Sequence, residues 1–521
     1  MLRHKAFKPG LLLTVVLLVC FCSVRWQPAS AAAAAESQPD NVLLLYDSLA
    51  KGTSREGNVA VLQQQLAAYR VQVTTLSLDR YRQGTMQSYG KVITVINAAD
   101  LDIANEAYKT DLAAYPGEYM HIGGNLPGRI ADIGQGALVR TDGRSIRLEA
   151  GPDSQSSIHP GPLTLIAAPE SGIYGTITVE GSAERFPYGV REGRNTYLPF
   201  MEKGNLSELA AAHVLKRWLQ VETAGRTYAV IKDITPFSDF KLLEAVTDRL
   251  YEAGIPFAGS IRPVISNTDY PAMKRYVEAL KYVQSRNGAI LIQAPVVLDG
   301  VSRSGQLLHS RMEEFIAVLA GYQVAPLGIG AELYWSYDKA YAEGGMGFFS
   351  SAVLFPDEKP LPIEPADTSK AFASALYSMP VSDLHRMERY SGAMPAFPMD
   401  TAVTIAFVED ERQLAAAVQT LIDSRIPFAD YRDGRHEVRT DAHRIASEDG
   451  VITIDGNRLQ ADYAPSIVSE DYKYQEETRK SFTRMFQVQN RFFIVVIGAA
   501  LIVFGVFLVA GRRLYKRKFM K

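Results

Sequence analysis

Two short stretches of this 521-residue chain carry side chains that could do chemistry, and Lys232-Asp233 is the first of them. The pair ends the apolar segment TYAVIKDI at 227–234. A lysine ammonium favours the ionised form of a neighbouring carboxylate, and a carboxylate can accept hydrogen bonds from sugar hydroxyls. Asp233 can equally cap the turn that begins at Thr235, so both roles stay open.

The second stretch is GAELYWSYD at 330–338, which places Glu332 close to Tyr334, Trp335 and Tyr337. A carboxylate beside aromatic faces suits the hydroxyls and apolar face of a pyranose ring. The alternative is a solvated helix end above buried aromatic residues. The 26 tyrosines of the chain allow the same two interpretations, a carbohydrate-binding surface or a core.

Metal chemistry is not indicated by the histidines. No H-x-x-x-H pattern occurs among the eight, and a divalent ion needs three or four ligands in fixed geometry. We interpret His309, His385, His436 and His443 as surface groups, because each lies among charged residues. The aspartates of 430–441 lack the spacing of a calcium loop.

The elements that must position these side chains form two α/β series. In the first, apolar strands at 41–47, 71–78, 91–97 and 119–122 surround a helix at 59–69. Continuous apolar strands of this kind predict a parallel sheet covered on both faces. The polar loop at 47–54 lacks the glycine pattern of a nucleotide site, so we interpret it as a plain connection.

Short alternating stretches between 136 and 203 predict a β-meander, which a helix at 206–219 closes. The second α/β series then starts at 226, with a helix at 239–253 and a strand at 255–263, and includes a helix at 411–423. Ile-Pro-Phe-Ala occurs at 255–258 and at 426–429, which indicates a recurring helix-to-strand corner.

Both ends of the chain carry targeting signals. Residues 1–31 combine early cations, an apolar run at 11–24 and Ala29-Ser30-Ala31, which predicts a secretory signal peptide, with an uncleaved anchor as the alternative. Cleavage would remove both cysteines and leave no thiolate chemistry. Residues 492–511 hold no charge and no proline, as expected of a transmembrane helix, and the basic tail 512–521 is expected in the cytoplasm.

Composition narrows the possible partners. The chain has 55 basic and 57 acidic residues, so nothing indicates a nucleic-acid surface. The expected location is therefore the cell membrane, crossed once, with the bulk outside the cytoplasm. ATP-, NAD- and thiol-dependent chemistry is improbable there, and a glycan is the expected ligand.

From Tyr228 to Pro263 the sequence resembles the polysaccharide-deacetylase (NodB-type) superfamily. The matching features are the strand ending in Lys232-Asp233, Thr235-Pro236, a helix, and AGIPFAGSIRPV. More narrowly, the chain resembles an uncharacterised membrane-anchored branch with an N-terminal flavodoxin-like domain, in which Gly123-Gly124-Asn125 follows a strand.

This resemblance spans most of 41–440 and implies an α/β architecture. After a linker at 32–40, it implies a flavodoxin-like parallel sheet domain with a β-rich insert, then a distorted (β/α) barrel of about seven strands. The implied divisions are the flavodoxin-like domain at 41–135, the β-rich segment and closing helix at 136–222, the barrel at 226–440, and a β-hairpin with a juxtamembrane stalk at 441–491.

The family's chemistry is metal-assisted removal of an acetyl group, which needs paired aspartates, two histidines and a late histidine. Here the aspartate pair becomes Lys232-Asp233, the histidine segment becomes AILIQAPVV with Gln293, and VTIAFVEDE offers no late histidine. Because Lys232 would also repel a metal, the resemblance implies a barrel that has lost its metal and needs no cofactor. Asp233 and Lys232 remain as catalytic candidates, and Gln293, Glu332 and Trp335 as substrate-binding candidates.

The first hypothesis is a catalytically degenerate deacetylase-like protein at the cell surface, acting in exopolysaccharide synthesis, export or modification. Its partners would be a polysaccharide or cell-surface glycan, the membrane through the C-terminal helix, and components of an exopolysaccharide synthase. The alternatives are an active carbohydrate esterase or glycosidase with an unconventional site, and a scaffold without carbohydrate contact.

Overall fold

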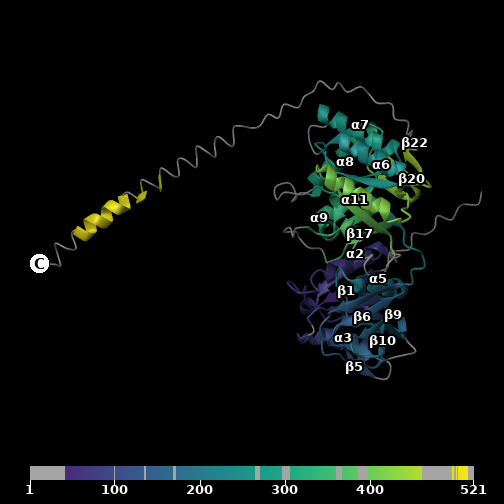
Figure 1. Ribbon diagram of the computed structural model, residues 1–521, viewed down its shortest axis with the longest axis vertical. Coiled ribbons are helices and arrows are strands. Elements are labelled where there is room, and N and C mark those ends of the chain that lie inside the picture. The colour runs from purple at the N-terminus through teal and green to yellow at the C-terminus, as the bar shows by residue number, and fades with distance from the viewer. Residues whose placement is uncertain are drawn as a thin grey trace, which may run out of the picture. The chain divides into compact units, whose positions relative to one another are not determined.

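The computed structural model describes residues 41–98, 100–133, 137–167, 172–264, 270–295, 305–358, 367–384, 386, 397–459 and parts of 496–513 (Figure 1). The predicted signal peptide, the linker and the charged stalk lie outside the described residues, as do parts of the predicted transmembrane segment and most of the basic tail. Among the helices that are described, none combines the length and the apolar character needed to cross a bilayer.

The N-terminal part is built on one mixed sheet of nine strands in the order β2-β1-β3-β4-β11-β10-β9-β6-β7. Pairing is parallel from β2 to β11 and antiparallel from β11 to β7. The predicted parallel sheet and β-rich segment are therefore halves of one sheet, because β11 returns alongside β4. The nine strands are β1 (Asn41–Tyr46), β2 (Gln72–Ser77), β3 (Lys91–Ile96), β4 (Glu118–Gly123), β6 (Ile146–Ala150), β7 (Asp153–Ile158), β9 (Gly172–Val179), β10 (Arg185–Glu192) and β11 (Asn195–Leu198). A separate antiparallel pair joins β5 (Leu138–Arg140) and β8 (Thr164–Ile166).

Helices cover both faces of this sheet, as the continuous apolar strands require. Along β1, Val42 and Leu44 belong to one buried cluster, whereas Leu43 and Leu45 belong to another on the opposite face. The first cluster includes residues of α2 (Asn58–Ala68) and α5 (Leu206–Trp218), and the second includes residues of α3 (Glu106–Ala114) and α4 (Gly128–Ala131). A strand buried on both faces has no polar alternation, which explains the sequence pattern.

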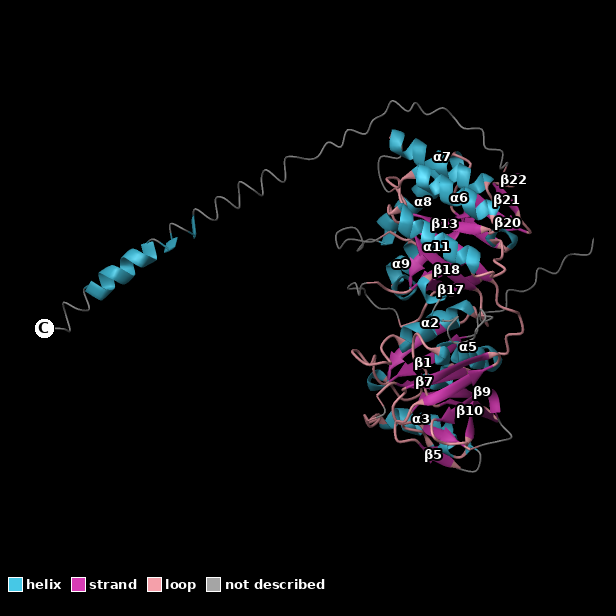
Figure 2. Cartoon of the chain, viewed as in Figure 1, coloured by secondary structure: helices cyan, strands magenta, loops and turns pink. Residues whose placement is uncertain are grey.

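The second part is a closed barrel of seven parallel strands, as predicted. Its strands are β12 (Thr227–Ile234), β13 (Phe257–Ile261), β14 (Gly288–Gln293), β15 (Pro326–Glu332), β16 (Ser351–Phe355), β17 (Ser374–Pro380) and β18 (Thr401–Ala406). Figure 2 shows helices around it, and these are α6 (Phe240–Glu252), α7 (Pro271–Ser285), α8 (Gly305–Gly321), α9 (Lys339–Gly344) and α11 (Glu411–Asp423). The sequence places a capping side chain at the start of α6, where Asp239 accepts from the amides of Lys241 and Leu242.

A helix of the N-terminal part packs on the barrel itself. Helix α2 contacts β17, and the Gln64 amide donates to the carbonyl oxygen of Leu354 in β16. The described parts of the connections between β16 and β18 hold no long helix that could cover these strands. One buried cluster accordingly runs from the sheet into the barrel. The two parts therefore share a core.

The end of the barrel at which its strands begin is closed by the segment after α11. Tyr431 and His436 are buried there and stack with their ring centroids 4.0 Å apart. The second Ile-Pro-Phe-Ala does not start a strand as the first does, because Phe428 makes only a single bridge with Thr227. A four-stranded antiparallel sheet follows, with β19 (His436–Arg439), β20 (Arg444–Glu448), β21 (Val451–Ile454) and β22 (Asn457–Arg458).

Candidate functional site

The barrel brings Lys232, Asp233, Gln293 and Glu332 to the end at which its strands finish. Lys232 and Asp233 lie near the end of β12, Gln293 is the last residue of β14, and Glu332 is the last residue of β15. Because all seven strands are parallel, their carboxyl ends form one mouth, where barrel enzymes hold their active sites. Lys232, Gln293 and Glu332 line one small hollow at this mouth.

The backbone at Asp233 is strained. Its φ is +68°, in the left-handed region that few residues other than glycine adopt, and the pairing of β12 with β13 shifts register between Ile231 and Ile234. The backbone amide of Asp233 donates to Oε1 of Gln293 at 2.7 Å, which holds this conformation in place. Such strain costs about 1 to 3 kcal/mol and persists only where the surroundings enforce it, commonly at functional sites.

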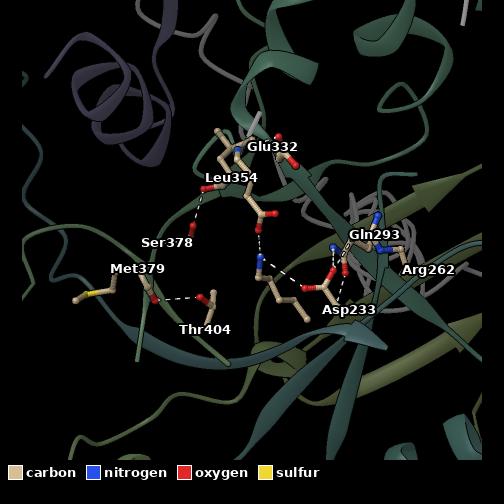
Figure 3. A network of polar contacts seen from close by, with 10 residues as sticks. Asp233, Arg262, Gln293, Glu332, Leu354, Ser378, Met379 and Thr404 are labelled. Atoms are coloured by element: carbon tan, nitrogen blue, oxygen red, sulfur yellow. Dashed lines mark hydrogen bonds and ion pairs between the residues drawn. The ribbon is translucent and has the colours of Figure 1, made fainter. Parts of the chain in front are cut away.

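Two donors occupy one oxygen of the Asp233 carboxylate (Figure 3). Arg262 Nη2 donates to Oδ1 at 2.6 Å and Gln293 Nε2 donates to the same oxygen at 2.8 Å. Lys232 Nζ lies 3.6 Å from the other oxygen, Oδ2. Burial by itself raises the pKa of Asp233, but these three partners outweigh burial and lower the pKa below its usual value.

Lys232 links Asp233 to the loop after β16. Its Nζ donates to Oε1 of Glu358 at 2.7 Å and lies 5.5 Å from the centre of the Phe355 ring. The amide of Glu358 in turn donates to Oε2 of Glu332 at 3.2 Å. Arg262, Asp233, Lys232 and Glu358 thus form a chain of alternating charge across the mouth.

Glu332 and Asp357, two further carboxylates at the mouth, have raised pKa values, whereas the pKa of Asp233 is lowered. Burial, reinforced by the negative charges of Asp357 and Glu358, raises the pKa of Glu332 above its usual value. Burial also raises the pKa of Asp357, whose Oδ1 accepts from the amide of Tyr334 at 3.0 Å. Asp233 is therefore the strongly ionised carboxylate of the site, and Glu332 holds its proton to higher pH.

The described part of the mouth leaves little space inside the barrel. The hollow has a volume of about 20 Å³, which is room for roughly one water molecule. Gly330 forms part of its wall, and a Cβ there would lie 2.7 Å from Ser260 Oγ and 2.7 Å from a Phe355 ring carbon. The Ser260 hydroxyl is buried and has no hydrogen-bond partner among the described residues.

Trp335 does not have the exposed face that sugar stacking requires. Its side chain is 1 % exposed, its ring stacks on Tyr341 at 4.6 Å, and its Nε1 donates to the Tyr334 hydroxyl at 3.0 Å. It belongs to the short helix η4 (Leu333–Tyr337) and lines the same hollow as Lys232, Gln293 and Glu332, although it is buried. The alternative interpretation of this stretch, in which the aromatic residues are buried, therefore fits the structure.

Two residues of the mouth, Arg262 and Glu358, were not singled out from the sequence, nor were Phe237 and Tyr270, which lie between β12 and α6 and between β13 and α7. Arg262 directly follows the end of β13, and Asp233 is the penultimate residue of β12, so their positions at neighbouring strand ends could have indicated Arg262. Phe237 is 74 % exposed in the loop after β12, and Tyr270 is 55 % exposed before α7. Isolated exposed aromatic residues carry no signal in a sequence.

Of the histidines predicted at the surface, His309 is exposed and His443 is partly exposed, whereas His385 lies outside the described residues. His436 was predicted at the surface but is buried, with Nδ1 2.7 Å from Ser351 Oγ and Nε2 2.7 Å from the carbonyl oxygen of Tyr431. The charged neighbours in sequence misled the prediction, because they alternate with His436 along β19. Across the residues with described side chains, no group of three or more His, Cys, Asp or Glu side chains is arranged to hold a metal ion.

Comparisons with known proteins give only distant similarities. No protein-family model and no curated protein matches the chain. One similar structure is described as a T48 deacetylase with substrate, with 11 % identity, a TM-score of 0.25, and coverage of 39 % of this chain and 85 % of that chain. Another is a beta-arabinopyranosidase, with 10 % identity, a TM-score of 0.23 and coverage of 59 % of each chain. Similarity at this level carries no argument about activity.

Proposed function

We propose that this chain is a carbohydrate-binding protein of the cell surface, whose deacetylase-like barrel recognises a glycan at its mouth without hydrolysing it. The observation that carries the proposal is the state of Asp233. Its Oδ1 is held by Arg262 and Gln293, its Oδ2 faces Lys232, and its pKa is lowered. A carboxylate in this environment is a weak base but a strong hydrogen-bond acceptor.

The size of the hollow supports binding over the mouth rather than within the barrel. A pocket that encloses a small ligand has a volume of about 300 to 1,000 Å³, far more than the hollow offers. Phe237 and Tyr270, whose rings are exposed, lie on the connections that follow β12 and β13, and in this proposal they stack on sugar faces. Polar groups in the middle with aromatic groups at the rim suit a glycan chain.

The predicted signal peptide and C-terminal transmembrane helix complete this proposal. They would hold the barrel outside the cell beside the membrane, where a nascent exopolysaccharide emerges from its synthase. In that position the protein would bind the glycan chain or a synthase component. Protease added to intact cells tests this location. Cleavage of the ectodomain in intact cells supports it, and cleavage only after lysis contradicts it.

A second candidate is a carbohydrate hydrolase, and the opposed pKa shifts favour it. A raised pKa at Glu332 and a lowered pKa at Asp233 are what a general acid and its ionised partner need. Against it, both oxygens of Asp233 already face cations or donors, so Asp233 is poorly placed to act as a nucleophile or base. A scaffold without carbohydrate contact is the third possibility.

The test is binding and hydrolysis of N-acetylglucosamine oligomers by the full-length chain. Glycan binding without product, weakened by Asp233→Asn and Phe237→Ala but unchanged in Glu252→Gln, supports the proposal. Glu252 is the control because it is exposed at the far end of α6, away from the mouth. If the chain forms product and Glu332→Gln abolishes it, the protein is a hydrolase instead. If the chain binds no oligomer, the proposal is wrong and a scaffold without carbohydrate contact is favoured.

A further inference from the structure

The N-terminal sheet carries a groove of its own, far larger than the hollow of the barrel. Its volume is about 860 Å³, within the range of small-molecule sites. It is lined by the loops that follow β3 and β4 and by the helices α3 and α4. Open α/β sheets bind their ligands at the carboxyl ends of parallel strands, and β3 and β4 are parallel neighbours.

Arg129 lines this groove, and hydrogen bonds to neighbouring residues hold its side chain in place. Its Nε donates to Asn195 Oδ1 at 2.7 Å, and its Nη1 donates to the carbonyl oxygens of Leu112 and Tyr115 at 3.0 Å each. Its guanidinium lies 5.1 Å from the centre of the Tyr119 ring. These partners set the plane of the guanidinium, so little conformational entropy remains to be lost when a ligand binds.

The positive charge of Arg129 is not compensated by the residues that hold it. Its hydrogen-bond partners are a neutral amide and two carbonyl oxygens, and among the described residues no ion pair joins it to a carboxylate. Burial lowers the pKa of Arg129 below its usual value, because the charge has lost water without gaining an anion. Its Nη2 has no partner among the described residues, so this nitrogen can donate to a carboxylate oxygen in a charge-assisted hydrogen bond.

The rest of the lining limits which anion fits. Asp102 and Asp132 are exposed at the rim, where they disfavour a dianion such as phosphate but accept hydrogen bonds from hydroxyls. Lys109 is engaged with Glu106 at 2.8 Å. Leu112 and Leu126 supply apolar wall, on which the face of a sugar ring can pack.

We propose that this groove binds an acidic sugar, a hexuronic acid, with its carboxylate on Arg129, its hydroxyls toward Asp102 and Asp132, and its ring against Leu126. The site is separate from the barrel mouth and does not rest on the function proposed for it. A chain with both sites would contact a polysaccharide at two places, one of them selective for carboxylated residues.

Saturation-transfer NMR on the full-length chain tests this site with D-glucuronate, D-glucose and glucose 6-phosphate as separate probes. The proposal is supported if the saturation-transfer signal of glucuronate is about tenfold or more stronger than the signals of the other two probes. Equal saturation of glucose and glucuronate, or no saturation of glucuronate, overturns it. Asp233→Asn is expected to leave the glucuronate signal unchanged, which separates this site from the barrel mouth.

Two variants address Arg129 without relying on one that could unfold. Arg129→Lys keeps a cation but loses the contacts that fix the guanidinium and its free Nη2 donor, so glucuronate binding should fall by about tenfold. Asp132→Asn removes an exposed negative charge from the rim but keeps an oxygen that accepts from the sugar hydroxyls, so glucuronate binding should strengthen severalfold relative to glucose binding. An unchanged or lower ratio of glucuronate to glucose binding in Asp132→Asn would contradict the proposed placement of the carboxylate.

Discussion

Acidification should destabilise this protein through His436, which closes the end of the barrel opposite the candidate site. Burial lowers the pKa of His436 to about 4, and the charge of Arg226 acts in the same direction, although the hydrogen bond to the Tyr431 carbonyl partly opposes them. The imidazole is therefore neutral in the folded chain at pH values where an unfolded histidine, with a pKa of about 6.5, is already protonated.

The magnitude follows from these two pKa values. A group whose folded pKa is depressed binds protons more readily when unfolded, so its stabilising contribution is complete above about pH 7 and is lost as the pH falls. Relative to pH 8, His436 should cost roughly 2 kcal/mol of folding free energy at pH 5 and roughly 3 kcal/mol at pH 4. Buried His121 in β4, whose pKa is also lowered to about 4, should add a similar amount.

The assay is denaturant unfolding of the full-length chain at pH 8 and pH 5, with His436→Gln compared with the natural sequence. The variant should be less stable at pH 8, because its contacts to Ser351 and Tyr431 are lost, yet its loss between pH 8 and pH 5 should be smaller by about 2 kcal/mol. His309→Gln, exposed on α8, is the control and should keep the full pH dependence. If His436→Gln retains the same pH dependence as the natural chain, the burial argument is wrong.

Three further predictions concern the barrel. Arg262→Gln should raise the pKa of Asp233, because it removes the strongest lowering partner, and carbonyl-carbon NMR titration would show the shift; an unchanged Asp233 titration would contradict the assigned network. Gly330→Ala should cost about 1 to 3 kcal/mol in thermal or denaturant unfolding, because its Cβ would press on Ser260 and Phe355, whereas Gly254→Asn, at a left-handed turn with open space, should cost far less. Residues 226–459 expressed alone should aggregate or unfold, because α2 no longer covers β17, and a soluble, cooperatively folding fragment would refute this dependence.

The sequence predicted the architecture where burial is regular. The strands at 41–47 and 227–234 are apolar without alternation because they are covered on both faces, and the structure confirms both the parallel half of the sheet and the seven-stranded barrel. It could not show that β11 joins the two halves of the N-terminal sheet, since that pairing links residues 195–198 with 119–122 and depends on tertiary packing.

The candidate site was predicted in the same uneven way. The resemblance to deacetylases indicated Lys232, Asp233 and Gln293, and the aromatic neighbours indicated Glu332; parallel strands bring all four to one end of the barrel. Trp335 was chosen because its ring stands beside that carboxylate in the sequence, but the ring is buried. Arg262 was not identified because its role depends on a hydrogen bond with Asp233, which lies 29 residues away in the chain. No local sequence pattern indicates such a contact.

Lys232 does more than take the place of the aspartate that deacetylases have here, because it forms ion pairs with Asp233 and Glu358. With Nζ 3.6 Å from Asp233 Oδ2, a divalent ion bound to that oxygen would meet the ammonium at a separation of roughly 4 Å, which costs about 8 kcal/mol at an effective dielectric constant of 20. Restoring the aspartate by Lys232→Asp would remove this repulsion but would also leave Glu358 without its 2.7 Å partner beside Glu332 and Asp357. Five carboxylates, counting the introduced one, would then lie at the mouth with Arg262 as their cation. The lysine is therefore part of the charge balance of the present site, and its replacement alone should weaken the fold of the mouth more readily than it creates a metal centre.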